Sequence, residues 1–199
     1  DAAAEEAYVF DRAGDYRVMF NNVLWDDTAE TPAAERNHLT AAIVEAYLPD
    51  VVGLQEVSPN KRALCGESDL ALLLSELGYK EADVGEVTND YGVNFVPIFY
   101  RKDAVSLIDC GWYWYQAQNK PIAQDDQSSK SFTWAVFESN NGQHFTVVST
   151  HMCTQSDSIR MEQAIELVDF LTELRKEYPY PVLVGGDFNA DMNSNSYAW

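Results

Sequence analysis

The chain has 199 residues, of which 46% are hydrophobic and 13% aromatic, so it is long and apolar enough to fold as one domain around a core. Its 13 basic and 32 acidic residues give a net charge of −19, which disfavours a nucleic-acid partner because such binding rests mainly on Lys and Arg. No run approaches the roughly 18 apolar residues of a membrane-spanning helix, which excludes a helical membrane protein over this stretch.

The first half of the chain alternates strand-like and helix-like segments. Apolar residues alternate in the first segment, whereas Leu39, Ile43 and Tyr47 recur at the spacing of a helix. The predicted elements are a strand over 16–25, a helix, a buried strand over 51–56, and a second helix over 69–77 closed by Gly78. The first helix has Thr31 as its N-cap and Pro32 as its first helical residue, and it stops at Pro49.

The second half is richer in hairpins. Strands are predicted over 95–101, 104–113, 132–138, 144–150 and 180–185, and a long helix capped by Asp157 with Ile165, Val168 and Leu171 facing inward. Segments 88–94 and 116–130 are expected to be loops, the second being either a binding element or a mobile surface connection. This order of elements predicts an α/β protein with two packed sheets and helices outside.

The aromatic run 112–115 allows two interpretations. It is a strand whose alternate rings pack into the core, or a surface on which a sugar or lipid headgroup stacks. The three cysteines form no zinc or CxxC spacing, so mostly free thiols are expected, with one disulfide possible.

Polar side chains follow several of the predicted strands, and these strand ends carry the functional signal. Glu56 follows the apolar run 51–54 and Gln55. Because α/β proteins gather strand ends at one edge of a sheet, such side chains are expected to converge. A carboxylate there suits a hard cation such as Mg²⁺, and the alternative is an ordinary surface acid. Gln55 and Glu56 should point to opposite faces, so one of them reaches a given pocket.

Three further strand ends add an acid, two amides and an imidazole. Asp187 and Asn189, two residues apart after a pair of glycines, can orient a water and bind an oxygen, or form an Asx-rich turn. His151 ends another strand and can serve a developing phosphoryl charge, or be a satisfied, partly buried histidine. Asn21 is expected to position Glu56 or a metal-bound water, and is otherwise a common strand-end residue.

In chain order, these segments resemble motifs of the endonuclease/exonuclease/phosphatase superfamily, which includes DNase I-like nucleases, neutral sphingomyelinases and inositol polyphosphate phosphatases. The resemblance implies a four-layer α/β/β/α sandwich of two mixed sheets flanked by helices, and Mg²⁺-dependent cleavage of phosphoesters, with Mn²⁺ or Ca²⁺ as alternatives. The segments that carry it are Val18-Met19-Phe20-Asn21, Leu54-Gln55-Glu56, Pro97-Ile98-Phe99-Tyr100-Arg101, Ser149-Thr150-His151, Ser158-Ile159-Arg160-Met161-Glu162-Gln163-Ala164 and Gly186-Asp187-Phe188-Asn189.

By this resemblance, Glu56 is the main metal ligand and Asn21 its neighbour. His151 is expected to contact the phosphoryl group. Asp187 and Asn189 are expected to orient water and phosphate. Tyr100 matches the family pattern less closely and is expected to line the substrate pocket.

The sequence departs from the family pattern after the last of these motifs. Members end with a further strand and an Asp-His pair whose His is the general base, and no His follows His151 here. The chain is therefore expected to be a single family domain over 1–199 that lacks this segment and one or more last strands, and to be impaired as it stands.

The sequence thus predicts a metal-dependent hydrolase of phosphoester bonds, a phosphodiesterase or phosphatase that acts as a monomer on a small molecule or lipid headgroup. The alternatives are a non-catalytic phosphate-binding module on the same scaffold and a secreted nuclease. The first six residues hold no basic or apolar segment and no initiator Met. They fit a secreted or periplasmic protein after removal of its leader, or a trimmed cytoplasmic one.

Overall fold

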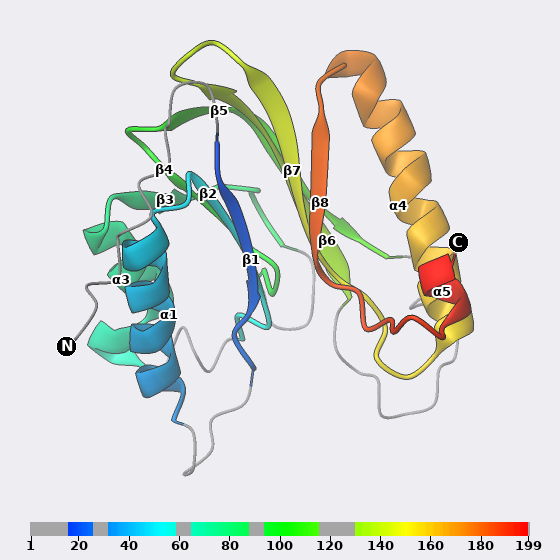
Figure 1. The fold of residues 1–199 in the computed structure, drawn as a ribbon, viewed down its shortest axis with the longest axis horizontal. Helices are drawn as coiled ribbons and strands as arrows, with labels where there is room; N and C mark the ends of the chain where they lie inside the picture. Colours follow the sequence, from blue (N-terminus) through cyan, green and yellow to red (C-terminus); the bar gives the residue numbers. More distant parts are fainter. Residues whose placement is uncertain (1–15, 26–31, 59–64, 88–93, 116–129, 199) are drawn as a thin grey trace, which may run out of the picture.

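Two four-stranded sheets pack face to face with helices on both outer sides (Figure 1). The computed structural model describes residues 16–25, 32–58, 65–87, 94–115 and 130–198. Helices α1 (Ala33–Tyr47) and α3 (Leu70–Glu76) cover one sheet, and α4 (Asp157–Glu177) covers the other. The four-layer α/β/β/α sandwich expected from the sequence is confirmed.

The first sheet has the strand order β1-β2-β4-β3. Strands β1 and β2 are parallel, and the remaining neighbours are antiparallel. The short edge strand β3 was not predicted, because three residues after a helix give too little periodicity to distinguish a strand from a turn. The bounds are Val18–Asn22 for β1, Val51–Gln55 for β2, Tyr79–Glu81 for β3 and Ile98–Arg101 for β4, with a 3-10 turn at Gly66–Ser68.

The second sheet has the order β5-β6-β7-β8, in which β7 and β8 are parallel. Parallel β8 follows β7 through α4, which is the crossover that a parallel pair requires. A short helix, α5 (Asn195–Ala198), lies against α4 near its N-terminus. The strand bounds are Val105–Trp114 for β5, Ser131–Ser139 for β6, His144–His151 for β7 and Val182–Asp187 for β8.

The aromatic end of β5 sends alternate rings to opposite faces. Tyr113 and Tyr115 belong to the core beneath α4, where Tyr113 stacks on Phe132 at a centroid distance of 5.0 Å. Burial and the nearby charge of Glu166 raise the pKa of Tyr115 well above its usual value, although the hydrogen bond with Thr150 opposes that rise. Trp112 and Trp114 contact each other edge to face at 5.9 Å. The predicted core packing of alternate rings is therefore confirmed.

In both long helices, the buried face is not the one that carries the large apolar residues at helical spacing. In α1, Leu39 and Tyr47 are 65% and 64% exposed, while the small or polar Ala33, Asn37, Thr40, Ala41 and Val44 are buried. In α4, Ile165 and Val168 are exposed, so their predicted inward orientation is wrong; Leu171 does pack against the core. The inward face of α4 is instead the stripe that contains Gln163, Leu167 and Phe170.

The helix starts also differ by one residue from the prediction. Helix α1 begins at Ala33 with Pro32 in the N-cap position. Ser156, and not Asp157, caps α4 by accepting a hydrogen bond from the Ile159 backbone. Asp69 caps α3 by accepting from the Ala71 backbone. Serine and aspartate are equally good caps, so their order before a helix does not reveal which one is used.

The two sheets approach closely where a ring lies over two glycines. Phe20 is paired with Gly53 across β1 and β2, and Gly185 is paired with Ser149 across β7 and β8. A Cβ at Gly185 would lie 2.3 Å from the Phe20 ring, and one at Gly53 would lie 2.8 Å from it. The absence of side chains at both positions lets Phe20 fit between the sheets.

Several remaining expectations concern cysteines, loops and membrane helices. Cys65, Cys110 and Cys153 are all free thiols. Burial, assisted by the charge of Asp109, raises the pKa of the Cys110 thiol. The two expected loops lie outside the described residues except for Asn94 and Lys130. Within the described part of the chain, no helix has the length and apolar content that crossing a bilayer demands.

Candidate functional site

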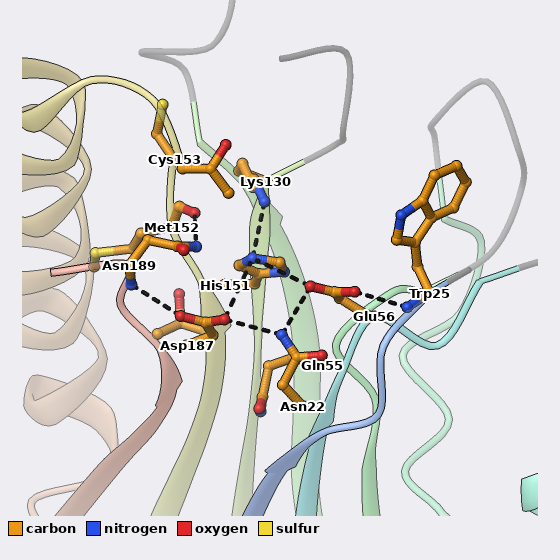
Figure 2. Close-up of polar contacts among 12 residues, drawn as sticks. Asn22, Trp25, Gln55, Glu56, Lys130, His151, Met152, Cys153, Asp187 and Asn189 are labelled. Atoms are coloured by element: carbon orange, nitrogen blue, oxygen red, sulfur yellow. Dashed lines mark hydrogen bonds and ion pairs between the residues drawn. The ribbon is translucent and has the colours of Figure 1, made fainter. Parts of the chain in front are cut away.

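The ends of β1, β2, β7 and β8 bring four polar side chains together across the two sheets (Figure 2). Asn22 lies two residues beyond Phe20, and His151 two residues beyond Ser149, so each shares a face with a residue of the close inter-sheet contact. Asp187 is the partner of His151 across the parallel β7–β8 pair. The tight packing just below the site therefore sets the distance between its two halves.

Glu56 and Asp187 are held in the same manner. One oxygen of each carboxylate accepts a backbone N–H: Glu56 Oε2 from Trp25 at 2.7 Å, and Asp187 Oδ1 from Asn189 at 2.9 Å. The other oxygens, Glu56 Oε1 and Asp187 Oδ2, both accept from Asn22 Nδ2, at 2.8 and 2.9 Å. Two carboxylates thus present their second oxygens toward a common point.

Asn22, and not Asn21, supplies the amide that joins the carboxylates. Its own side-chain oxygen accepts from the Leu24 backbone at 2.9 Å, which fixes the amide orientation. Adjacent strand residues point to opposite faces, so a single step along β1 decides which asparagine enters the site. The expected residue, Asn21, is the earlier of two identical neighbours, whereas the alternation that leads inward from Phe20 favours Asn22.

Glu56 enters the site through an unusual backbone conformation. Gln55 points between the sheets and donates a hydrogen bond to Ser149 Oγ at 3.0 Å, so its neighbour would point away in a regular strand. Glu56 has φ 65°, in the left-handed region that non-glycine residues seldom occupy. This turn after β2 directs the carboxylate to Asn22, which strict alternation did not predict. A non-glycine residue in this conformation costs about 1–2 kcal/mol.

Asn189 also has a positive φ, 50°, a conformation that asparagine tolerates well. Its side-chain amide donates to the Met152 carbonyl at 2.9 Å, while its backbone holds Asp187. The predicted Asx turn is therefore present, with the Asp187 carboxylate accepting from the Asn189 backbone. Asn189 links the turn after β8 to the turn after β7.

The turn after β7 is held from α4. Arg160 Nη1 donates to the carbonyls of Cys153 and Thr154, and Gln163 accepts from the Cys153 backbone at 2.8 Å. Arg160 also forms an ion pair with Asp157, which accepts hydrogen bonds from α5. These contacts explain why buried polar residues occupy the first turns of α4.

His151 is 7% exposed and lies beside both carboxylates. Its Nε2 is 4.0 Å from Glu56 Oε1 and 3.9 Å from Asp187 Oδ2. Lys130 Nζ, from the residue before β6, is 2.9 Å from the same Nε2. Lys130 was not predicted, because it lies in a polar segment without periodicity. It comes close to His151 because the next residue, Ser131, pairs with His151 across β6 and β7.

Tyr100 does not lie at the site, which corrects the expectation that it lines the pocket. It is buried between the sheets, where its ring is 5.5 Å from that of Phe137. Its partner in β2 is Val51, at the opposite end of the strand from Glu56. Because β4 runs antiparallel to β2, its C-terminal residues point away from the site edge.

The site offers a group of metal-binding atoms. One ligand atom each from Glu56, His151 and Asp187 lies within 4.8 Å of the others. Carboxylate oxygens are the donors that hard divalent cations prefer, and Glu56 and Asp187 each supply one here, so the residues fit such an ion. A cation there would also relieve the repulsion between two neighbouring carboxylates.

The fold agrees with comparisons to known proteins. The chain is 24% identical over 170 residues to Nocturnin from Xenopus laevis, an alignment that covers 82% of this chain and 42% of that protein. The chain thus spans about two fifths of the length of this curated relative. Its structure superposes on a mannosyl-6-phosphatase from Bacteroides thetaiotaomicron with a TM-score of 0.75 and 22% identity, covering 92% and 68% of the two chains.

A second structural neighbour is the human Nocturnin catalytic domain with a bound sulfate anion, at a TM-score of 0.72 and 23% identity. That superposition covers 92% of this chain and 67% of the neighbour. At sequence identities of 22% and 23%, the two superpositions show the fold alone. The model of the endonuclease/exonuclease/phosphatase family matches residues 22–199. With the match covering most of the chain, this protein belongs to the endonuclease/exonuclease/phosphatase family.

Proposed function

We propose that the protein is a Mg²⁺-dependent phosphoesterase whose centre lies between Glu56, Asn22, His151 and Asp187. The observation that supports this most directly is the convergence of Glu56 Oε1 and Asp187 Oδ2 on Asn22 Nδ2 and His151 Nε2. Glu56 and Asp187 would hold the cation through these oxygens. When bound, the cation would neutralise charge on a phosphate oxygen.

The residues around that centre then have separate tasks. Asn22 holds both carboxylates in position through two hydrogen bonds. His151, beside them and nearly buried, contacts the phosphoryl group. Asp187 orients the attacking water, and Asn189 fixes Asp187 through its backbone N–H. Fixed hydrogen-bond partners of this kind accelerate a reaction because they need no reorganisation in the transition state.

A small phosphorylated molecule is the favoured substrate class. The net charge of −19 opposes a long polyanion, which is bound mainly through many basic contacts. A structural neighbour acts on a phosphorylated sugar, a mannosyl-6-phosphate, which supports the same class. A single phosphate needs one compact site of the kind seen here.

The test uses the protein as its gene encodes it. We expect Glu56→Gln, which removes the charge but keeps the shape, to reduce turnover of a phosphoester in Mg²⁺ by about 100-fold or more. Glu173→Gln, at an exposed position on α4, is the matched control. Unchanged turnover in Glu56→Gln would remove this residue from the mechanism. Binding of Mg²⁺ and phosphate without any hydrolysis by the wild type would instead favour the non-catalytic module.

A further inference from the structure

Trp25 presents a large aromatic side chain to solvent at the edge of the site. The residue is 54% exposed, although tryptophan is among the side chains that are most buried on average. Figure 2 shows its indole on the Glu56 side of the centre, where it projects beyond the ends of the strands. The ring therefore lies beside the proposed cation site and contributes little to the core.

Three hydrogen bonds hold the backbone that carries this ring. Leu24 donates its N–H to Asn22 Oδ1 at 2.9 Å, and Trp25 donates its N–H to Glu56 Oε2 at 2.7 Å. The Trp25 carbonyl accepts from Ser58 Oγ at 2.9 Å. Two of these partners, Asn22 and Glu56, belong to the centre itself. The position of Trp25 is therefore fixed relative to the place that the proposed function gives to the cation.

The segment before Trp25 adopts an unfavourable conformation. Leu24 has φ 56°, in the left-handed region, as does Glu56. Leucine lacks the short polar side chain through which asparagine compensates for this conformation. Residues held in this way cluster at active sites and ligand-binding segments. Core packing does not offset the cost here, because the ring that follows is exposed, so the strain points to a ligand.

We infer that Trp25 binds the ring of a cyclic phosphorylated compound, a sugar phosphate or an aryl phosphate, and favours it over an acyclic phosphate ester. This inference rests on the proposed function for the location of the phosphate. An indole is flat, rigid and apolar, so it gains contact area at a low cost in conformational entropy. It removes the apolar face of a sugar ring or the face of an aromatic ring from water.

Calorimetry with phosphonates in excess Mg²⁺ is the deciding measurement, because their C–P bond resists hydrolysis and the result does not depend on turnover. Trp25→Ala should weaken binding of the ring-bearing phosphonate about 5- to 30-fold and leave methylphosphonate unchanged. Trp25→Phe should retain most of the affinity. A larger loss for cyclohexylphosphonate assigns a saturated ring such as a sugar, and a larger loss for phenylphosphonate assigns an aromatic ring.

The matched control is Tyr47→Ala. Tyr47 is another exposed aromatic residue, and it precedes β2 at the opposite end of that strand from Glu56. This substitution should leave the affinity for all three phosphonates unchanged.

A second measurement separates a binding role from a structural one. Trp25→Ala keeps the backbone N–H that Glu56 accepts, so Mg²⁺ affinity and the melting temperature should stay the same. With mannose 6-phosphate or p-nitrophenyl phosphate, whichever carries the favoured ring, KM should rise about 5- to 30-fold while kcat is retained. Glycerol 3-phosphate, which has no ring, should show neither change. An effect exerted through Glu56 would instead reduce Mg²⁺ affinity and kcat for every substrate.

The two proposals fail in different ways. If Glu56→Gln abolishes turnover while Trp25→Ala binds all three phosphonates as the wild type does, the inference about Trp25 is wrong and the proposed function stands. Equal losses for the ring-bearing phosphonates and methylphosphonate would also overturn it. If the wild type hydrolyses no phosphoester, the proposed function fails, and a ring-selective loss in Trp25→Ala would still support the binding role.

Discussion

Replacing Gly185 with alanine tests whether the contact between the sheets holds the two halves of the site in position. The new methyl group would lie 2.3 Å from Cδ2 and Cε2 of Phe20, far inside van der Waals contact. The ring cannot retreat freely, because its other edge lies close to Gly53, where a Cβ would be 2.8 Å away. Part of the strain must therefore appear as a movement of β1 relative to β8.

The expected cost follows from overpacking. Inserting a methyl group into a filled core costs about 1–3 kcal/mol. The φ of Gly185 is not in the left-handed region, so alanine is allowed there and regains up to about 1 kcal/mol through the unfolded chain. A net destabilisation of about 1–2 kcal/mol remains. Asn22 and Asp187, each two residues beyond the contact, should separate, so turnover should fall as well.

A double-mutant cycle by denaturant unfolding distinguishes this mechanism from others. Phe20→Leu alone leaves a cavity, but combined with Gly185→Ala it provides room for the methyl group. We expect the double variant to be more stable than the sum of the single effects by about 1–2 kcal/mol. Gly142→Ala, in the hairpin between β6 and β7 with open space around it, should combine additively with Phe20→Leu. Additive effects for Gly185→Ala within about 0.5 kcal/mol would refute the reasoning.

Single substitutions test hydrogen bonds at the site and at both ends of α4. Asn22→Ala should lower Mg²⁺ affinity and phosphoester turnover about tenfold more than Asn21→Ala, because Asn22 donates to both carboxylates. Equal effects of the two substitutions would show that the Asn22 amide does not hold the carboxylates in position. Hydrogen bonds from Ser196, with smaller contributions from Asn195, lower the pKa of Asp157 from 3.8 to about 2. The resulting stabilisation is present above pH 3.8 and is lost as the pH falls through about 2. Amide exchange at Asn195 and Ser196 should therefore accelerate as the pH falls over that interval. Asp157→Asn should show the faster exchange at every pH. The hydrogen bond to Asp109 raises the pKa of Tyr178 to about 12, so phenolate absorbance in Tyr178→Phe should lose a component that titrates near pH 12 in the wild type.

The sequence was sufficient to locate strand ends because buried strands leave long apolar runs that stop abruptly at polar residues. Glu56, His151 and Asp187 were identified in this way, and the structure brings their ligand atoms within 4.8 Å of one another. The choice between Asn21 and Asn22 depended on the phase of one short strand, which two identical residues cannot reveal. Lys130 reaches the site through strand pairing, which no local pattern encodes.

The helices show a second limit of sequence reasoning. Large apolar residues at helical spacing predicted α1 and α4 correctly, yet Leu39, Ile165 and Val168 are exposed. The buried stripe of α1 is made of small or polar residues and Val44. That of α4 begins with Arg160 and Gln163, which hold the turn after β7 through hydrogen bonds. Function and close packing, and not hydrophobicity alone, decide which face is covered.

The left-handed conformation of Glu56 implies that this residue lowers the stability of the fold relative to a glycine at the same position. Glycine would adopt the same backbone angle without penalty, so a chain selected for durability alone would carry glycine there. Glu56→Gly should accordingly melt no lower than the wild type despite losing the hydrogen bonds to Asn22 and Trp25. A carboxylate kept against its own conformational preference indicates that natural selection has acted on what this side chain does rather than on what it contributes to folding.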